Sequence, residues 1–240
     1  KPTPYLEIGI SRAAQTCGEG RRCNFDSFVE LLIGNDNRVG ELTLDEEPGN
    51  QLAGVDFRFS LARYKLPVAV YGQLIGDDEA NGLPSRFVGL AGAEWWGQVG
   101  RHSLRTYLEV ADTQTGVLDA RLPDFAYSSA VFPGGFRFNG RAHGHSADGD
   151  SLIGTFGAIL QDQDDQRWMA LVQGGELNRV GNRATPVAAD AADYFNVEVS
   201  HQRTLAKGTL QISVGYEHFA PTAAPTESGV KGFVQWTWKR

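Results

Sequence analysis

The chain has 240 residues and a formal net charge of −7, with no long basic or acidic run. This length allows one large domain with a sizeable core, and the charge argues against nucleic acid as a partner. No window holds the roughly 18 apolar residues of a membrane helix, a test that does not exclude membrane proteins built from strands.

The start of the chain combines a polar end with a closely spaced cysteine pair. The first four residues, KPTP, lack the apolar core of a signal peptide, so we expect a mature form, a cytosolic protein or a fragment. Cys17 and Cys23 follow in CGEGRRC, where two intervening glycines make a loop that a disulfide can close. A disulfide is favoured over two free thiols, and two ligands are too few for a metal site.

The next segment, FDSFVELLIGNDN, has helical periodicity. Its apolar residues recur three, four and seven positions apart: Phe25, Phe28, Val29 and Leu32. Ser27 and Glu30 fit a capping box, and Gly34 fits a helix end. We predict a short helix over 27–33, with a strand as the alternative. Its apolar stripe should pack against other protein.

Most of the remaining chain alternates apolar and polar residues with period two. In GVDFRFSLAR, for example, Val55, Phe57 and Phe59 share one face. Clear alternation recurs near residues 103–111, 194–202, 209–217 and 230–238. Noisier segments are Tyr5–Ser11, Leu66–Gly76, Arg86–Gly97, Phe125–Val131, Phe136–His145, Ser151–Gln161 and Arg167–Gly175. The pattern predicts about ten to twelve strands of roughly nine to eleven residues, the length of a tilted transmembrane strand rather than a sandwich strand.

The connections between these strands differ in length. Lys65-Leu66, Gly97–Arg101 and Ala206–Gly208 are short, whereas GDDEANGLPS, DTQTGVLDARLPD, NRVGNRATPVAADAAD and APTAAPTESG are long and polar. The tryptophans fall near strand ends, as an interfacial girdle would place them: Trp95, Trp96, Trp168, Trp236 and Trp238. We therefore predict an all-β fold, an antiparallel transmembrane β-barrel with one short helix, as a single domain over 1–240. A soluble barrel is the alternative.

Two polar segments are candidates for chemistry. In GRAHGHSADGDS, His143 and His145 could ligate a metal with a third ligand from elsewhere, or act with Ser146 in a nucleophile system. A polar strand ending in a turn is the simplest interpretation. In VAVYGQLIGDDEANG, the carboxylates Asp77, Asp78 and Glu79 could form a metal site, an acid/base pair or a solvated loop. No phosphate-binding loop is present, and we predict no cofactor and no metal.

The segment LPVAVYGQLIGDDEANGLPSRFVGLAGAEWW (66–96) resembles the Wzi family of capsule assembly proteins. FDSFVELLIGNDN, YLEVADT and FRFNGRAHGHSADGDS show the same resemblance in the family's order, from about Phe25 to about Ser151. The resemblance implies an outer-membrane β-barrel that helps to anchor capsular polysaccharide, in effect a lectin without enzymatic activity. Family members are longer, so the predicted barrel can be part of a larger one, and CGEGRRC is not typical of them.

From these features we predict a non-enzymatic barrel in the bacterial outer membrane, whose partners are surface polysaccharide and membrane lipid. An acidic polymer would pair with Arg137 and Arg141. The full set expected to contact polysaccharide is Arg137, Arg141, His143, His145, Asp77, Asp78, Glu79 and Arg183. The alternatives are a structural subunit with an envelope protein partner, a passive pore, and a barrel enzyme that uses His143 or His145 with Ser146.

Overall fold

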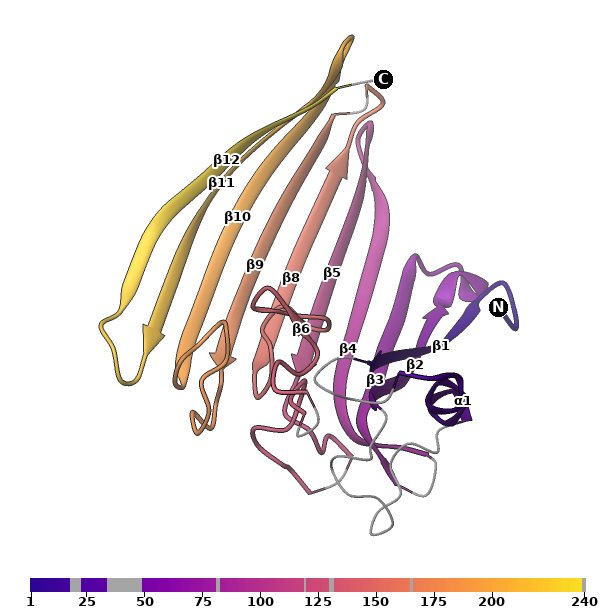
Figure 1. Ribbon diagram of the computed structural model, residues 1–240. Helices are drawn as coiled ribbons and strands as arrows, with labels where there is room; N and C mark the ends of the chain where they lie inside the picture. Colours follow the sequence, from indigo (N-terminus) through magenta and orange to yellow (C-terminus); the bar gives the residue numbers. More distant parts are fainter. Residues whose placement is uncertain are drawn as a thin grey trace.

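The computed structural model describes residues 1–17, 23–33, 49–80, 83–118, 120–129, 132–164 and 166–238. One curved antiparallel sheet of ten strands dominates it (Figure 1). The strands neighbour one another in chain order: β1 (Leu6–Thr16), β2 (Gly49–Ser60), β3 (Val68–Ala80), β4 (Leu83–Val99), β5 (His102–Asp112), β8 (Leu152–Gln161), β9 (Arg167–Leu177), β10 (Ala192–Leu205), β11 (Gly208–Pro221) and β12 (Glu227–Trp238). The all-β antiparallel prediction is confirmed. In the described part of the chain the sheet stays open, with β1 and β12 at its edges.

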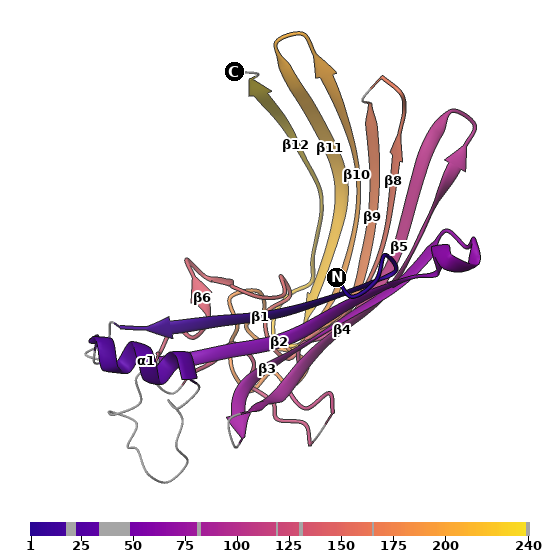
Figure 2. The same ribbon diagram turned by 90° about the vertical axis from the view of Figure 1, so that its right-hand side faces the viewer.

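The connection between β5 and β8 is where the strand prediction is wrong. The described residues of Phe125–Val131 form turns, and Phe136–His145 contributes only a small hairpin, β6 (Arg137–Phe138) and β7 (Arg141–Ala142). Left-handed backbone at Tyr127 and Asn139 interrupts any extended run there. The connection instead folds into the concavity of the sheet (Figures 1 and 2).

The predicted long loop GDDEANGLPS is a second correction. β3 continues to Ala80 and β4 begins at Leu83, and Asp78 pairs with Ser85 across the hairpin. The acidic triplet therefore belongs to the end of a strand. The connections β5–β8 and β9–β10 remain long and lie at this same end, whereas the turns β4–β5 and β10–β11 at the opposite end are short.

Helix α1 (Phe25–Ile33) confirms the helical prediction but begins two residues earlier than expected. Asn24 is its cap. The Asn24 Oδ1 accepts from the Ser27 N–H at 2.8 Å, and the Ser27 Oγ accepts from the Asn24 N–H at 3.1 Å. The prediction that Ser27 begins a capping box is therefore wrong, because Asn24 caps the helix. The predicted helix end at Gly34 lies outside the described residues. The apolar stripe is largely exposed within this chain, with Phe25 77% accessible, so its packing against other protein stays a prediction. No helix in the described ranges is long and apolar enough to cross a membrane.

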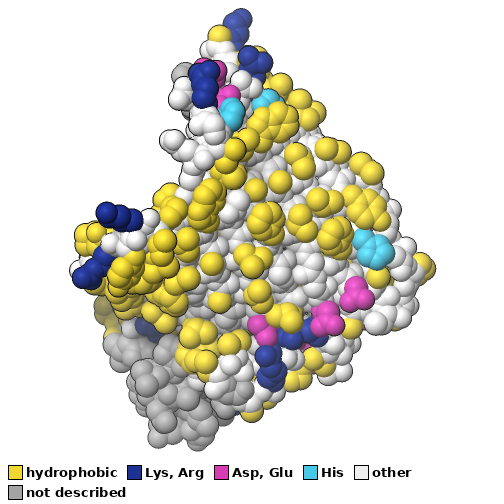
Figure 3. Space-filling model, turned by 180° about the vertical axis from the view of Figure 1, so that it is seen from behind, with side chains coloured by type: hydrophobic (Ala, Val, Ile, Leu, Met, Phe, Trp, Pro, Cys, Tyr) yellow, Lys and Arg dark blue, Asp and Glu magenta, His cyan; other side chains and the backbone are white. Residues whose placement is uncertain are grey.

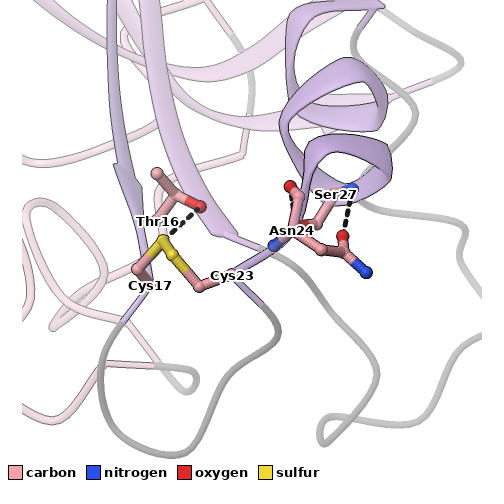
Figure 4. Close-up of a disulfide and its surroundings, with 5 residues drawn as sticks. All are labelled: Thr16, Cys17, Cys23, Asn24 and Ser27. Atoms are coloured by element: carbon pink, nitrogen blue, oxygen red, sulfur yellow. Dashed lines mark hydrogen bonds between the residues drawn. A yellow bond between two sulfur atoms is a disulfide. The ribbon is translucent and has the colours of Figure 1, made fainter.

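A disulfide joins Cys17 and Cys23, as predicted from their spacing (Figure 4). It closes the chain between the end of β1 and the cap of α1. The other end of the helix is held as well, because the Arg12 Nη1 of β1 donates to the Leu32 carbonyl at 2.6 Å. These links fix α1 beside β1.

The cross-strand register sorts the side chains of the sheet into two faces. Exposed apolar side chains gather on the convex face, away from the β5–β8 connection, and charged groups lie mainly above and below them (Figure 3). In register on this face are Ile10, Val55, Leu108, Val110, Phe156, Val172, Val199, Val214, Tyr216 and Val230, all exposed.

Four of the five tryptophans also lie on the convex face, at the end with the short turns: Trp95, Trp168, Trp236 and Trp238. Trp168 stacks on His201 with ring centroids 4.1 Å apart. Trp96 differs, because it faces the concave side, where the Arg58 guanidinium lies 5.6 Å from its ring. The girdle prediction therefore fits four tryptophans and is wrong for Trp96.

Candidate functional site

A row of mostly polar residues crosses the concave face at one level of the sheet. Each strand contributes one residue in register with its neighbours: Glu7, Arg58, Tyr71, Gly92, Glu109, Thr155, Gln173, Asn196, Glu217 and Gly229. Residues directly opposite in adjacent strands have neighbouring side chains. The row is therefore a continuous band, which we call the polar belt.

Around β2–β5 the polar groups of the belt are paired with one another or with concave-face residues next to the belt, Glu94 and Arg105. The Glu94 carboxylate, 4% exposed, accepts from the Arg58 Nε at 2.6 Å and from the Arg105 Nε at 2.7 Å. The Tyr71 hydroxyl donates to Glu109 at 2.7 Å. Gly92 leaves room for the Tyr71 ring, which a side chain there would strike. A buried carboxylate held by two guanidinium groups is stable only while both remain.

Around β8–β12 the belt carries amides and hydroxyls, with one charged pair at its end. The Gln173 Nε2 donates to the Thr155 Oγ1 at 3.3 Å, and Lys231 Nζ donates to Glu217 at 2.6 Å. The Asn196 Oδ1 is buried and has no hydrogen-bond partner among the described residues. This half therefore retains unused hydrogen-bonding capacity at Asn196.

The β5–β8 connection is anchored to the concave face by buried polar contacts. The Arg137 guanidinium donates two hydrogen bonds to the Asp148 carboxylate, from Nη2 to Oδ1 at 2.6 Å and from Nε to Oδ2 at 2.9 Å. It also donates to the Tyr127 carbonyl. The Tyr127 N–H donates to Asp77 on β3 at 2.6 Å. Bidentate pairing gives both energy and a fixed orientation. The connection is thus a folded part of the site.

Apolar contacts reinforce this anchoring. Tyr127 and Phe136 of the connection form a buried cluster with Leu52 of β2, Val88 of β4 and Ala126. Nearby, the Asp150 carboxylate accepts from the Asp124 N–H at 2.6 Å, yet burial raises the pKa of Asp150. The connection therefore packs against β2 and β4, and a cavity remains on each side of it.

Two cavities lie on either side of His145. One, of about 600 Å³, is lined mainly by residues of β9–β12, and we call it the β9–β12 cavity. The other, of about 400 Å³, lies toward β1–β5. The His145 Nδ1 accepts from the Ala147 N–H at 3.2 Å, so the neutral ring carries its proton on Nε2. Burial lowers the pKa of His145, which favours this neutral donor.

The structure gives the predicted contact residues different surroundings. Arg137 and Asp77 hold the connection in place. Asp78 and Glu79 lie in the last residues of β3, opposite Ser85 and Pro84. His145 lines both cavities and His143 the smaller one. Arg141 and Arg183 are exposed. Contact of these eight residues with polysaccharide remains a prediction.

Other residues of the cavities were not predicted from the sequence. Gln173, Tyr194, Glu217, Phe219 and Lys231 come together in the β9–β12 cavity. The alternation of apolar and polar residues assigns each of them to one face of its strand. Only the pairing of β9–β12 brings these side chains into one cavity. For His143 and His145, the described residues supply no group of three metal-ligating side chains.

Comparison with known proteins adds to what the sequence and the geometry of the site show. The family model described as capsule assembly protein Wzi matches residues 1–223. A protein of Klebsiella pneumoniae, described as an uncharacterized 55.8 kDa protein in the cps region, is 43% identical over 118 residues, which is 48% of this chain and 23% of that protein.

A solved structure is also similar. It is described as Wzi, an outer membrane protein involved in group 1 capsule assembly in Escherichia coli and a carbohydrate-binding β-barrel. It matches with a TM-score of 0.77 and 26% identity, over 97% of this chain and 48% of that one. The chain therefore spans about half the length of this solved relative.

Proposed function

The chain belongs to the Wzi family of capsule assembly proteins, and we propose that it acts as part of an outer-membrane β-barrel that binds and anchors a surface polysaccharide. The carrying observation is the contrast between an apolar, exposed convex face and a polar concave face covered by a folded connection. The solved relative of the same family is described as a carbohydrate-binding β-barrel of the outer membrane.

The convex face supports placement in a membrane. Its exposed apolar residues form a band with charged groups mainly beyond it (Figure 3). The strands of the sheet have 10 to 17 residues, at or above the roughly nine to eleven that cross a bilayer. The convex tryptophans then lie at one interface, on the side of the short turns.

The concave face supports binding rather than catalysis. The carboxylate of Glu94 and that of Glu109 are each engaged by neighbouring side chains, so neither is poised as a proton donor or acceptor for a substrate. The amide and hydroxyl groups around β8–β12 suit recognition of sugar hydroxyls. We therefore propose a non-enzymatic role.

Contact with a long polymer is proposed for the exposed side chains at the long-loop end. Arg141, His143 and Arg183 are accessible there, and their positive or polar groups would meet the polymer first. We propose that Arg137 and Asp77 act indirectly, because each already holds the connection through a short hydrogen bond.

Binding is tested with the protein folded in detergent and the purified surface polysaccharide of its source bacterium. Immobilised protein should bind the polysaccharide in biolayer interferometry, whereas the heat-unfolded protein and unrelated dextran serve as negative controls. Absence of binding to any capsular polymer, while the folded barrel still migrates faster than the boiled protein on gels, would refute the proposal.

A further inference from the structure

We propose that the β9–β12 cavity is a subsite for an uncharged, hydroxyl-rich sugar unit. This inference rests on the proposed function and deepens it, because it places recognition within the concave face rather than at exposed loop tips. The residues that carry it are His145, Gln173, Tyr194, Glu217, Phe219 and Lys231, all of which line the cavity.

The cavity has the size and construction of a small-ligand site. Its volume of about 600 Å³ falls within the roughly 300–1,000 Å³ typical of ligand pockets. One wall is the β5–β8 connection at residues 145–147, and the other is the sheet. The connection is held by the Arg137–Asp148 pair, and Ser151 Oγ donates to the Ala147 carbonyl at 2.9 Å. The wall is therefore preformed, which reduces the entropic cost of binding.

Two aromatic side chains supply an apolar surface for a sugar ring. Tyr194 and Phe219 are cross-strand partners on the concave face. Both pack against a buried cluster that contains Ala147, Ile153 and Leu177. Because this packing holds the rings in place, each can present a flat apolar surface to the C–H face of a sugar.

A donor and an acceptor lie beside this aromatic pair. Glu217 accepts from Lys231 at 2.6 Å and from the Tyr194 hydroxyl at 3.3 Å. The Glu217 and Lys231 side chains are 43% and 42% exposed, so both keep accessible lone pairs or protons. A carboxylate acceptor next to an ammonium donor matches two adjacent hydroxyls of one sugar.

The surroundings favour an uncharged ligand. Among the described residues that line the cavity, two are acidic, Glu217 and Glu227, and one is a cation, Lys231. With His145 in its neutral form, an anionic sugar would therefore meet net repulsion.

The test uses oligosaccharides released from the surface polysaccharide by partial acid hydrolysis and separated into neutral and acidic fractions. Calorimetric titration of the folded protein in detergent should show binding of the neutral fraction. Phe219→Ala and Glu217→Gln should each weaken it about tenfold, through loss of ring stacking and of a charged acceptor. Glu198→Gln, on the same face but outside the cavity, should leave affinity unchanged.

A chemical block gives an independent readout. The chain's two cysteines are bonded to each other, so Ser146→Cys supplies a single reactive thiol at the cavity wall. Attachment of a bulky maleimide there should abolish binding of the neutral fraction. The same label on Ser103→Cys, at the short-turn end, should have no effect.

The outcomes separate this inference from the proposed function. Wild-type protein that binds neither polymer nor fragments would refute the proposed function. Wild-type binding that survives both substitutions and the Ser146 label would refute the subsite alone, and selective binding of the acidic fraction would overturn the uncharged assignment. Faster gel migration of unboiled variants establishes that each is folded.

Discussion

The two faces of the sheet are built by the same strands but are stabilised differently. Along β11, Val214 and Tyr216 are exposed on the convex face, whereas Ser213 is buried and Glu217 is hydrogen-bonded on the concave face. An apolar face next to hydrocarbon needs no internal partners. A polar face needs its charges matched by neighbours. The comparison shows that most of the specific side-chain bonding belongs to the concave side.

Removing the buried ion pair should have the largest effect. Arg137→Met leaves Asp148, 1% exposed, without its partner and should cost about 3–5 kcal/mol. We expect the β5–β8 connection to detach, seen as a lower unfolding temperature in detergent and faster proteolysis within 113–151.

The matched control is Arg141→Met on the same hairpin, which removes an exposed arginine and should change little. Adding Asp148→Asn to Arg137→Met removes the unpaired charge and keeps a residue that tolerates the left-handed backbone at this position, so it should recover part of the lost stability. Equal proteolysis of wild type and Arg137→Met would contradict the anchoring role of the pair.

A charge on the convex face should have the next largest effect. Val110→Arg places a guanidinium on the face assigned to lipid and should cost about 2–4 kcal/mol near the bilayer centre. Gln73→Arg is the control, because Gln73 is one residue along β3 from the position in register with Val110 and lies on the concave face. It should change the stability little, because that face is polar. Chemical unfolding in lipid vesicles measures both, and a reversed order of the two costs would invalidate the face assignment.

Loss of the disulfide should have a smaller effect. Replacing Cys17 and Cys23 together by serine frees the short loop that joins β1 to α1 and should cost about 2 kcal/mol. Because α1 lies outside the concave face, polysaccharide binding should persist. Thermal unfolding with and without reductant provides the comparison, and reductant should change the wild type alone.

The smallest expected effect concerns pH. Burial lowers the pKa of His145 below its ordinary value of 6.5, so the folded protein resists the protonation that the unfolded chain accepts. The contribution of His145 to the free energy of unfolding is therefore full above pH 6.5 and decreases as the pH falls below 6.5. His145→Gln should flatten this part of the pH dependence of unfolding, and an unchanged slope would exclude the residue as its source.

The strands were predictable because each carries its own signal. Period-two alternation in β2, β10 and β11 shows one apolar and one polar face without reference to any neighbour. The disulfide was predictable from a spacing of six positions. The β5–β8 connection was not, because FRFNGRAHGHS alternates like a strand while left-handed residues such as Asn139 turn the chain.

The candidate site was less predictable, since it depends on register between strands. Glu217 and Lys231 meet because β11 and β12 pair, and His145 reaches the same cavity from a connection more than 70 positions earlier. From the sequence, Arg137 was predicted to be a cation accessible to a polymer. In the structure its guanidinium is instead hydrogen-bonded to Asp148, eleven positions later.

Quenching of single tryptophans tests most directly whether the two faces meet different surroundings. One variant retains only Trp168 on the convex face, and another retains only Trp96 on the concave face. In vesicles with brominated lipid, the fluorescence of Trp168 should be strongly quenched and that of Trp96 should be largely spared. Equal quenching of the two, or quenching of Trp96 alone, would contradict a barrel with its convex face in lipid and its concave face reserved for sugar.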